Sequence, residues 1–163
     1  MAKKLTHLDD DGRASMVDVG GKPATLREAV ASGLVEMSLE TLDLVAGAGL
    51  PKGDVLGTAR IAGILAAKKT ADLIPMTHPL PLTHVGVDFE IDRHRSAIVI
   101  TASARCEGPT GVEIEAMTAC AIAAVTIYDM CKSVEKGIVI REVRLERKSG
   151  GKSGTWLRST DDG

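Results

Sequence analysis

The sequence predicts an α+β fold: a ferredoxin-like, split βαβ arrangement with an antiparallel sheet, helices on one face and an extra helix in the first crossover. Segments with the two-residue alternation of strands and segments with helical periodicity follow the order strand, helices, strand, strand, helix, strand. The chain has 163 residues, a length that suits one compact domain. We therefore predict a single domain over residues 1–163, with flexible ends at about 1–20 and 155–163.

Capping residues mark the first helices. Residues 34–37 are predicted to form a short strand, and residues 38–45 a helix that Ser38 opens. Asp54 caps a second helix over residues 55–69, whose many small side chains allow a neighbouring element to approach closely. The chain before the first strand is polar and contains several glycines, so we expect it to be the most mobile part.

The second half of the chain contains the remaining strands. Residues 85–91 and 98–106 alternate apolar and polar side chains on either side of a short turn, which predicts a hairpin. A long helix follows at about residues 115–136. Residues 138–147 form the last strand, and their alternation slips near Arg141, which indicates a bulge.

The composition excludes several classes of function. The net charge of -2 provides no positive field for nucleic acid, and an aromatic content of 2% leaves no stacking platform for single strands. Three cysteines without a CxxC pair argue against a disulfide framework and a zinc site. No signal peptide is recognisable, and the apolar run 116–128 is shorter than the roughly 20 residues of a membrane span. We expect a cytoplasmic protein that binds neither membrane nor nucleic acid.

The long helix contains the most informative charges. From Ala116 to Tyr128 it has no charged side chain, so it is expected to be buried over most of its circumference. Asp129 and Lys132 then follow, three residues apart and on one face. They form either an ion pair where the helix surfaces, which spacing alone favours, or an acid and amine with coupled pKa values suited to proton transfer.

Other titratable residues have both structural and functional interpretations. Glu113 and Glu115 point to the same side if the backbone is extended and diverge if it is helical; as acids near a helix N-terminus they complement the helix dipole, which spacing favours. His78 stands on a stiff loop between two prolines, so its position is well defined. His84 is six residues further on, and no third ligand stands at a zinc-like spacing, so we predict no metal site.

The glycine-rich tail resembles a phosphate-binding loop only in part. The stretch 150–153 reads Gly-Gly-Lys-Ser, but Glu146 stands where the GxxxxGK[ST] pattern needs glycine, and no helix follows. Consecutive glycines can still form a nest of amides for a phosphate, with Lys148 and Lys152 beside it.

Taken together, these motifs make the chain similar to the MoaC family, the cyclic pyranopterin monophosphate synthases of molybdenum-cofactor (molybdopterin) biosynthesis. The similarity extends over nearly the whole chain, and its blocks stand in the family's order, which makes the signal specific. The blocks are residues 16–19, 52–54, 59–64, 72–75, 111–116, 128–132 and 148–154.

The resemblance implies a reaction and an assembly. The substrate would be 3′,8-cyclo-7,8-dihydro-GTP, a cyclised GTP intermediate whose purine is rearranged into a pyranopterin while a cyclic phosphate closes and pyrophosphate leaves; the enzyme is thus a phosphorus–oxygen lyase. No cofactor is required by the sequence, although Mg²⁺ is an alternative to the lysines for stabilising the leaving pyrophosphate. The assembly would be a homohexamer, a trimer of dimers with active sites at the dimer interfaces.

The same resemblance assigns residues to the site. Asp129 would be the catalytic acid or base, with Lys132 and Lys52 as its partners. Thr77 stands where the family usually has cysteine, which excludes a thiolate role there, and Ile114 replaces the commoner methionine. The substrate-binding positions would be Met76, Thr77, His78, Ile114, Glu115, Glu113, Lys68, Arg27 and Lys148.

Three alternatives remain at this stage. A non-catalytic ferredoxin-like module that binds a small anion would keep the fold and the basic pocket yet tolerate the loss of Asp129. A phosphate-loop nucleotidase is weakened by the failed spacing. An RNA-binding domain is weaker still, because the strands lack aromatic side chains.

Overall fold

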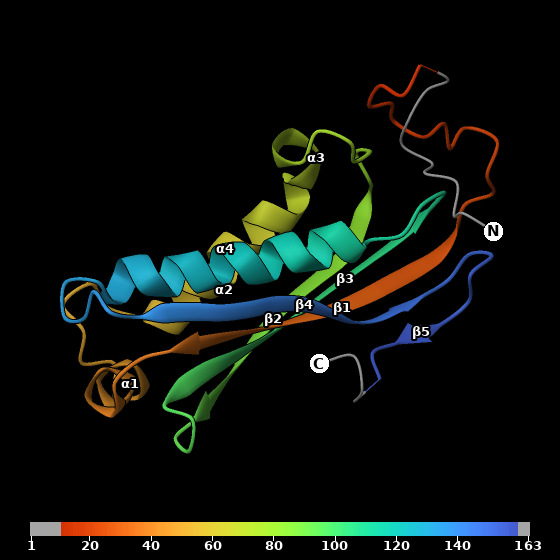
Figure 1. Ribbon diagram of the computed structural model, residues 1–163. Coiled ribbons are helices and arrows are strands. Elements are labelled where there is room, and N and C mark those ends of the chain that lie inside the picture. The colour runs from red at the N-terminus through yellow and green to blue at the C-terminus, as the bar shows by residue number, and fades with distance from the viewer. Residues whose placement is uncertain (1–10, 160–163) are drawn as a thin grey trace.

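The computed structural model, which describes residues 11–159, is an antiparallel sheet covered by helices on one face (Figure 1). The predicted flexible ends, about 1–20 and 155–163, lie partly outside the described residues and stay a prediction. The elements are β1 (Thr25–Glu36), α1 (Leu39–Ala46), α2 (Val55–Lys68), α3 (Thr70–Leu73), β2 (Leu82–Asp92), β3 (Ala97–Gly108), α4 (Glu113–Cys131), β4 (Val139–Ser149) and β5 (Trp156–Leu157).

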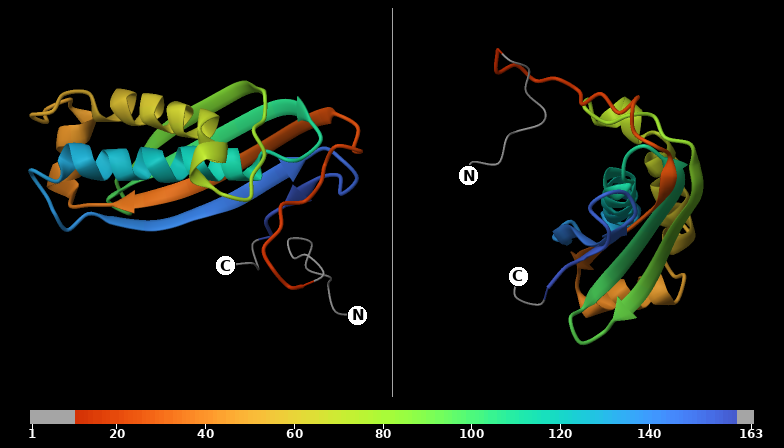
Figure 2. Two further views of the ribbon diagram at one scale, coloured as in Figure 1. Left: turned by 90° about the horizontal axis from the view of Figure 1, so that it is seen from above. Right: turned by 90° about the vertical axis from the view of Figure 1, so that its right-hand side faces the viewer.

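The sheet has the strand order of the predicted fold. Its five strands lie in the order β2-β3-β1-β4-β5, and every neighbouring pair is antiparallel. Viewed from above, α2 and α4 lie side by side over one face of this sheet (Figure 2). The ferredoxin-like, split βαβ prediction is confirmed, with α1 as the extra helix of the first crossover.

The first strand is longer than the predicted residues 34–37. It begins at Thr25, and its buried positions are Ala29, Ala31, Gly33 and Val35. Alanine and glycine contrast weakly with the serine and alanine around them, so hydropathy does not reveal the alternation. The pairing with β3 along the full length of β1 extends the strand beyond its apolar end.

The caps of the first helices are confirmed. The Ser38 side chain accepts a hydrogen bond from the Thr41 amide, and the Asp54 side chain accepts one from the Gly57 amide. The four residues of α3, just after Lys69, were not predicted.

Small residues let α2 and α4 pack closely. A Cβ added at Gly63 of α2 would lie 2.8 Å from the Ala119 carbonyl oxygen of α4. On its other side α4 lies against β1, where a Cβ at Gly33 would stand 2.7 Å from the Cys120 sulfur. These glycines therefore set how closely α4 can lie against both neighbours.

The ends of α4 differ from the prediction of residues 115–136. The helix begins at Glu113 and has its last helical residue at Cys131. Tyr128 donates a hydrogen bond to the Lys136 carbonyl oxygen across the turns that follow, at 3.2 Å. A periodic pattern does not distinguish such turns from one more turn of helix.

The expected burial of α4 over most of its circumference from Ala116 to Tyr128 is confirmed, and a narrow strip of the helix stays uncovered. Val125 keeps 52% of its surface exposed and Ile114 keeps 40%. Within residues 11–159, α4 alone is long and apolar enough to cross a membrane by those two criteria. Its other face packs against β1, β3 and β4, as expected for a core helix.

The predicted bulge in the last strand is confirmed. The pairing of β1 with β4 shifts register between Leu34 and Val35, opposite Arg141.

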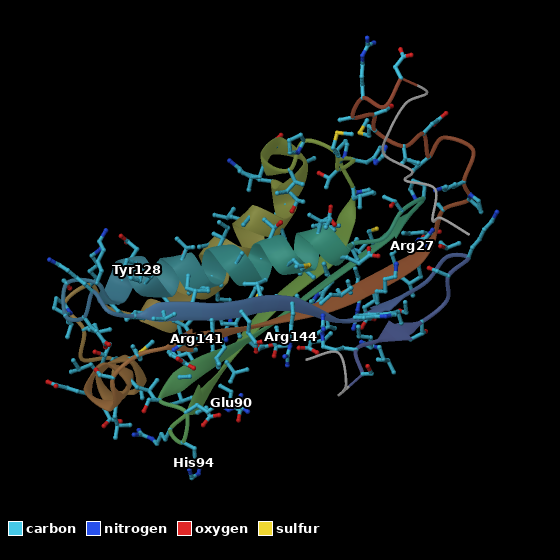
Figure 3. The ribbon with its side chains drawn as sticks, viewed as in Figure 1. Arg27, Glu90, His94, Tyr128, Arg141 and Arg144 are labelled. Atoms are coloured by element: carbon cyan, nitrogen blue, oxygen red, sulfur yellow. The ribbon has the colours of Figure 1, made fainter. Side chains whose placement is uncertain are left out.

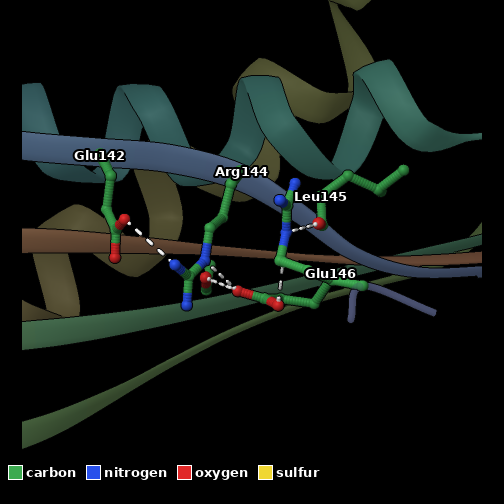
Figure 4. A network of polar contacts seen from close by, with 6 residues as sticks. Glu142, Arg144, Leu145 and Glu146 are labelled. Carbon is green, nitrogen blue, oxygen red and sulfur yellow. Dashed lines mark hydrogen bonds and ion pairs between the residues drawn. The ribbon is translucent and has the colours of Figure 1, made fainter. Parts of the chain in front are cut away.

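The sheet face away from the helices is polar. On this face Arg144 forms ion pairs along β4 with Glu146 at 2.6 Å and with Glu142 at 3.2 Å (Figure 4).

Candidate active site

Two segments bring Lys52, Asp129 and Lys132 together. Lys52 lies on the turn before α2, Asp129 in the last turn of α4, and Lys132 at the C-cap of that helix. The Lys52 ammonium donates to the Asp129 carboxylate at 3.1 Å and to its main-chain oxygen at 2.9 Å. The Lys132 ammonium lies 2.7 Å from the other carboxylate oxygen. One carboxylate is thus held between two ammonium groups.

These contacts decide the charge states of the cluster. The hydrogen bond from Lys132, followed by that from Lys52, lowers the pKa of Asp129 below its ordinary value. The same bond raises the pKa of Lys132. At neutral pH the Asp129 carboxylate is therefore held as an anion, paired with the Lys132 ammonium.

A cavity of about 400 Å³ opens at the other end of α4. The first and second substrate-binding segments predicted from the resemblance, around His78 and Glu115, both line it. Its remaining wall comes from the N-terminal segment. The lining residues are Val17, Val19, Lys22, Met76, Thr77, His78, Leu80, Thr110, Gly111, Glu113, Ile114 and Glu115.

Glu115 is the buried acid of this cavity. Only 4% of its surface is exposed, and desolvation raises the pKa of its carboxyl above the usual range. It also borders a smaller hollow of about 120 Å³, which Lys68 and His78 line as well. Lys68 thus lies near this end of α4.

A second cavity, of about 550 Å³, adjoins the first and is strongly basic. The Lys148 ammonium contacts the Glu113 carboxylate at 2.7 Å, from β4 to the start of α4. Arg27 lies beneath the glycine-rich loop and donates to the Gly108 and Pro109 carbonyl oxygens, each at 3.2 Å. The lining residues are Lys22, Pro23, Thr25, Arg27, Pro109, Thr110, Gly111, Glu113, Lys148, Gly151, Lys152 and Ser153.

The predicted site residues therefore form two groups at opposite ends of one helix. Tyr128, next to Asp129, and Arg27 of the basic cavity lie at opposite ends of the molecule (Figure 3). The helical segment from Ile114 to Asp129 spans about 22 Å at 1.5 Å per residue. A single chain does not bring the Asp129 cluster to the cavities.

Thr77 takes part in the local structure of its loop. Its hydroxyl donates to the Ile74 carbonyl oxygen at 2.8 Å, just after α3. This bond stabilises the turn that presents His78 to the first cavity. The threonine thus has a structural role there.

Several lining residues were not assigned from the sequence. Val17 and Val19 alternate with polar residues in one of the resemblance blocks, and this was the only available signal for them. Lys22 and Thr110 stand in irregular segments without periodicity, so nothing marked them. No group of three metal-binding side chains is found within residues 11–159.

A family model described as the MoaC family matches residues 16–151, which include the first cavity, the second cavity except Lys152 and Ser153, and the Asp129 cluster. The chain belongs to the MoaC family. The match covers most of the chain and contains every site residue assigned above.

Individual members of the MoaC family are similar over nearly their whole length. A protein from Desulforapulum autotrophicum is 58% identical over 94% of each chain. One from Roseiflexus sp. is 59% identical over 94% of this chain and 97% of its own, and one from Bordetella pertussis is 54% identical over 93% and 94%. All three are named cyclic pyranopterin monophosphate synthase.

Proposed function

We propose that this chain is a cyclic pyranopterin monophosphate synthase, a lyase of molybdenum-cofactor biosynthesis that acts in the cytoplasm. Its substrate is 3′,8-cyclo-7,8-dihydro-GTP, and its products are cyclic pyranopterin monophosphate and pyrophosphate. The observation that carries this proposal is the Lys52–Asp129–Lys132 cluster, assembled from distant segments of a chain that is 54–59% identical to synthases of that name.

The cluster contains a carboxylate and two amines that the rearrangement can use for proton transfer. Opening and reclosing a purine ring needs several proton transfers. Asp129, kept anionic by its two lysines, accepts protons, while Lys52 and Lys132 donate them. Because the three groups are in contact, a proton taken by one changes the proton affinity of the others.

The two cavities match the two parts of the substrate. The first combines apolar side chains with His78 and two acids, and it suits the ring system. The second contains four cationic side chains, and it suits the triphosphate. The reaction needs no cofactor from the protein, and any Mg²⁺ arrives with the triphosphate or leaves with pyrophosphate.

The complete site requires two copies of the chain. In our proposal two α4 helices pack antiparallel about a two-fold axis near Ala121 and Ile122, midway between Ile114 and Asp129. A symmetric interface of this kind brings the Asp129 end of one copy to the cavities of the other. The surface of α4 around Val125 is uncharged and partly exposed, which supports this face as the dimer interface. Three such dimers form the proposed hexamer.

Incubation with the cyclised GTP intermediate tests the activity. We expect an oxidisable pterin, detected by fluorescence, together with pyrophosphate. Asp129→Asn and Lys52→Ala should remain folded, because both side chains are exposed, and should lose turnover. Folded wild-type protein that forms neither product, or variants that retain near-full turnover, would favour the non-catalytic binding module instead.

Mixed assemblies test the shared site. Asp129→Asn and Glu115→Gln, expressed separately, should each be inactive. Co-expressed, they should regain turnover, because each mixed dimer contains one site with both halves intact. Val125→Glu should separate the dimer in sedimentation velocity, while Val125→Ala should not. No recovery in verified mixed dimers would contradict the sharing.

A further inference from the structure

The two cavities meet at four residues. Lys22, Thr110, Gly111 and Glu113 line both of them, whereas the other lining residues belong to one cavity only. Any ligand that extends from the first cavity into the second must pass these four. Lys22 is the only cation of the four, and so far it counts only as one of the four cations of the second cavity.

The two charged groups at this junction differ in their partners. The Glu113 carboxylate is held by Lys148 at 2.7 Å. The Lys22 ammonium, by contrast, has no hydrogen-bond or ion-pair partner anywhere in the described part of the chain. A free cation in a cavity that already contains Arg27, Lys148 and Lys152 is held against like charges, and an anionic ligand would relieve that repulsion.

A turn in the N-terminal segment places Lys22 at the junction. The Lys22 amide donates to the Val19 carbonyl oxygen at 3.0 Å, and the Gly20 amide donates to the Asp18 side chain at 2.8 Å. Val17 and Val19 are half-buried and line the first cavity, so they anchor the segment. The backbone of Lys22 is therefore positioned before a ligand binds.

The character of the cavities decides which part of the ligand lies at the junction. With the ring system in the first cavity and the terminal phosphates in the second, the α-phosphate lies between them, beside Lys22. This placement rests on the proposed function.

We propose that Lys22 binds the α-phosphate and stabilises the charge that shifts when the cyclic phosphate closes. In that step a substrate hydroxyl oxygen bonds to the α-phosphorus. The bond from this phosphorus to the bridging oxygen breaks, and its electron pair leaves with pyrophosphate. The hydroxyl proton passes to water. An ammonium beside the non-bridging oxygens stabilises this transition state more than the ground state.

The test compares Lys22→Met with Lys152→Met, which lines the second cavity only. In Lys22→Met we expect kcat for pyrophosphate release to fall on the order of 100-fold. Rapid quench and mass analysis should then detect a rearranged species that keeps its triphosphate. Lys152→Met should chiefly raise KM. Lys22→Arg, which keeps the charge, should recover most of the rate.

Each other outcome overturns the role of Lys22. An unchanged kcat, or a rise in KM alone, would mean that Lys22 does not act in the phosphate step. Equal slowing of ring rearrangement and pyrophosphate release, without the triphosphorylated species, would mean a general structural effect. Lys22→Gln, checked by circular dichroism, guards against misfolding. A wild-type protein without pterin or pyrophosphate would instead refute the proposed function, and the Lys22 proposal with it.

Discussion

At Gly33 the backbone of β1 lies close to α4, so the added methyl group of Gly33→Ala should overlap sterically with that helix. The added Cβ would stand 2.7 Å from the Cys120 sulfur and 3.2 Å from the Glu142 carbonyl oxygen. Ordinary contacts lie at about 3.5–4.0 Å. Gly33 is buried in β1, and Cys120 is fully buried in α4.

The magnitude follows from two opposing effects. Overpacking of this kind costs about 1–3 kcal/mol. Replacing glycine stabilises by about 0.4–1 kcal/mol, through the lower entropy of the unfolded chain. We therefore expect Gly33→Ala to lower the free energy of unfolding by about 1–2 kcal/mol. Cys120→Ala alone should cost about 1 kcal/mol, for a small buried cavity.

The decisive measurement is the double variant. Removing the Cys120 sulfur also removes the close contact, so Gly33→Ala combined with Cys120→Ala should cost less than the sum of the two single changes. Urea unfolding at one protein concentration measures this coupling, because assembly makes stability concentration-dependent. Gly137→Ala is the control, since a Cβ there meets nothing within 4 Å. Additive costs, within about 0.5 kcal/mol, would refute the steric explanation.

Three further predictions concern the site. Burial raises the pKa of Glu115 in the folded state. The stability that the protonated carboxyl contributes is therefore complete below the pKa of the unfolded chain, and it is lost as the pH rises through the pKa of the folded state. Glu115→Gln should be more stable than the wild type at neutral pH in urea unfolding, with a flatter pH dependence. The pKa of Asp129 is lowered, chiefly by Lys132, so the acidic limb of kcat should lie below the ordinary range of aspartate. Lys132→Met should move that limb to higher pH in whatever turnover remains, and an unmoved limb would assign it to another group. Arg27→Met removes two charged hydrogen bonds and should lower the unfolding free energy by about 1–3 kcal/mol, while retention of wild-type stability would mean that those bonds contribute nothing.

The sequence predicted best where neighbouring side chains contrast in polarity. In the hairpin, Val87 and Phe89 alternate with Asp88 and Glu90, and the strands form where the alternation predicts. In β1 the buried positions before Val35 are alanine and glycine, so the signal vanishes there although the pairing is complete. Small residues are needed at these positions because α4 lies close to β1, and this proximity is evident only in the folded structure.

The residues of the candidate site also differ in how far the local sequence predicted them. Asp129 and Lys132 are three residues apart on one helix, so local periodicity was enough to pair them. Lys52 lies 77 positions before Asp129, and only the resemblance connected the two. Lys22 had no signal at all, because its place depends on two cavities that no local pattern encodes.

The length of α4 limits how this protein can vary. One residue inserted between Ile114 and Asp129 would rotate everything beyond it by about 100° and shift it by about 1.5 Å. Asp129 would then leave Lys52, which the α2 end holds in place. Even a seven-residue insertion, which nearly restores the rotation, would move the cluster about 10 Å further from the cavities. Natural insertions and deletions should therefore occur in the turn between β2 and β3, and α4 should keep its number of residues.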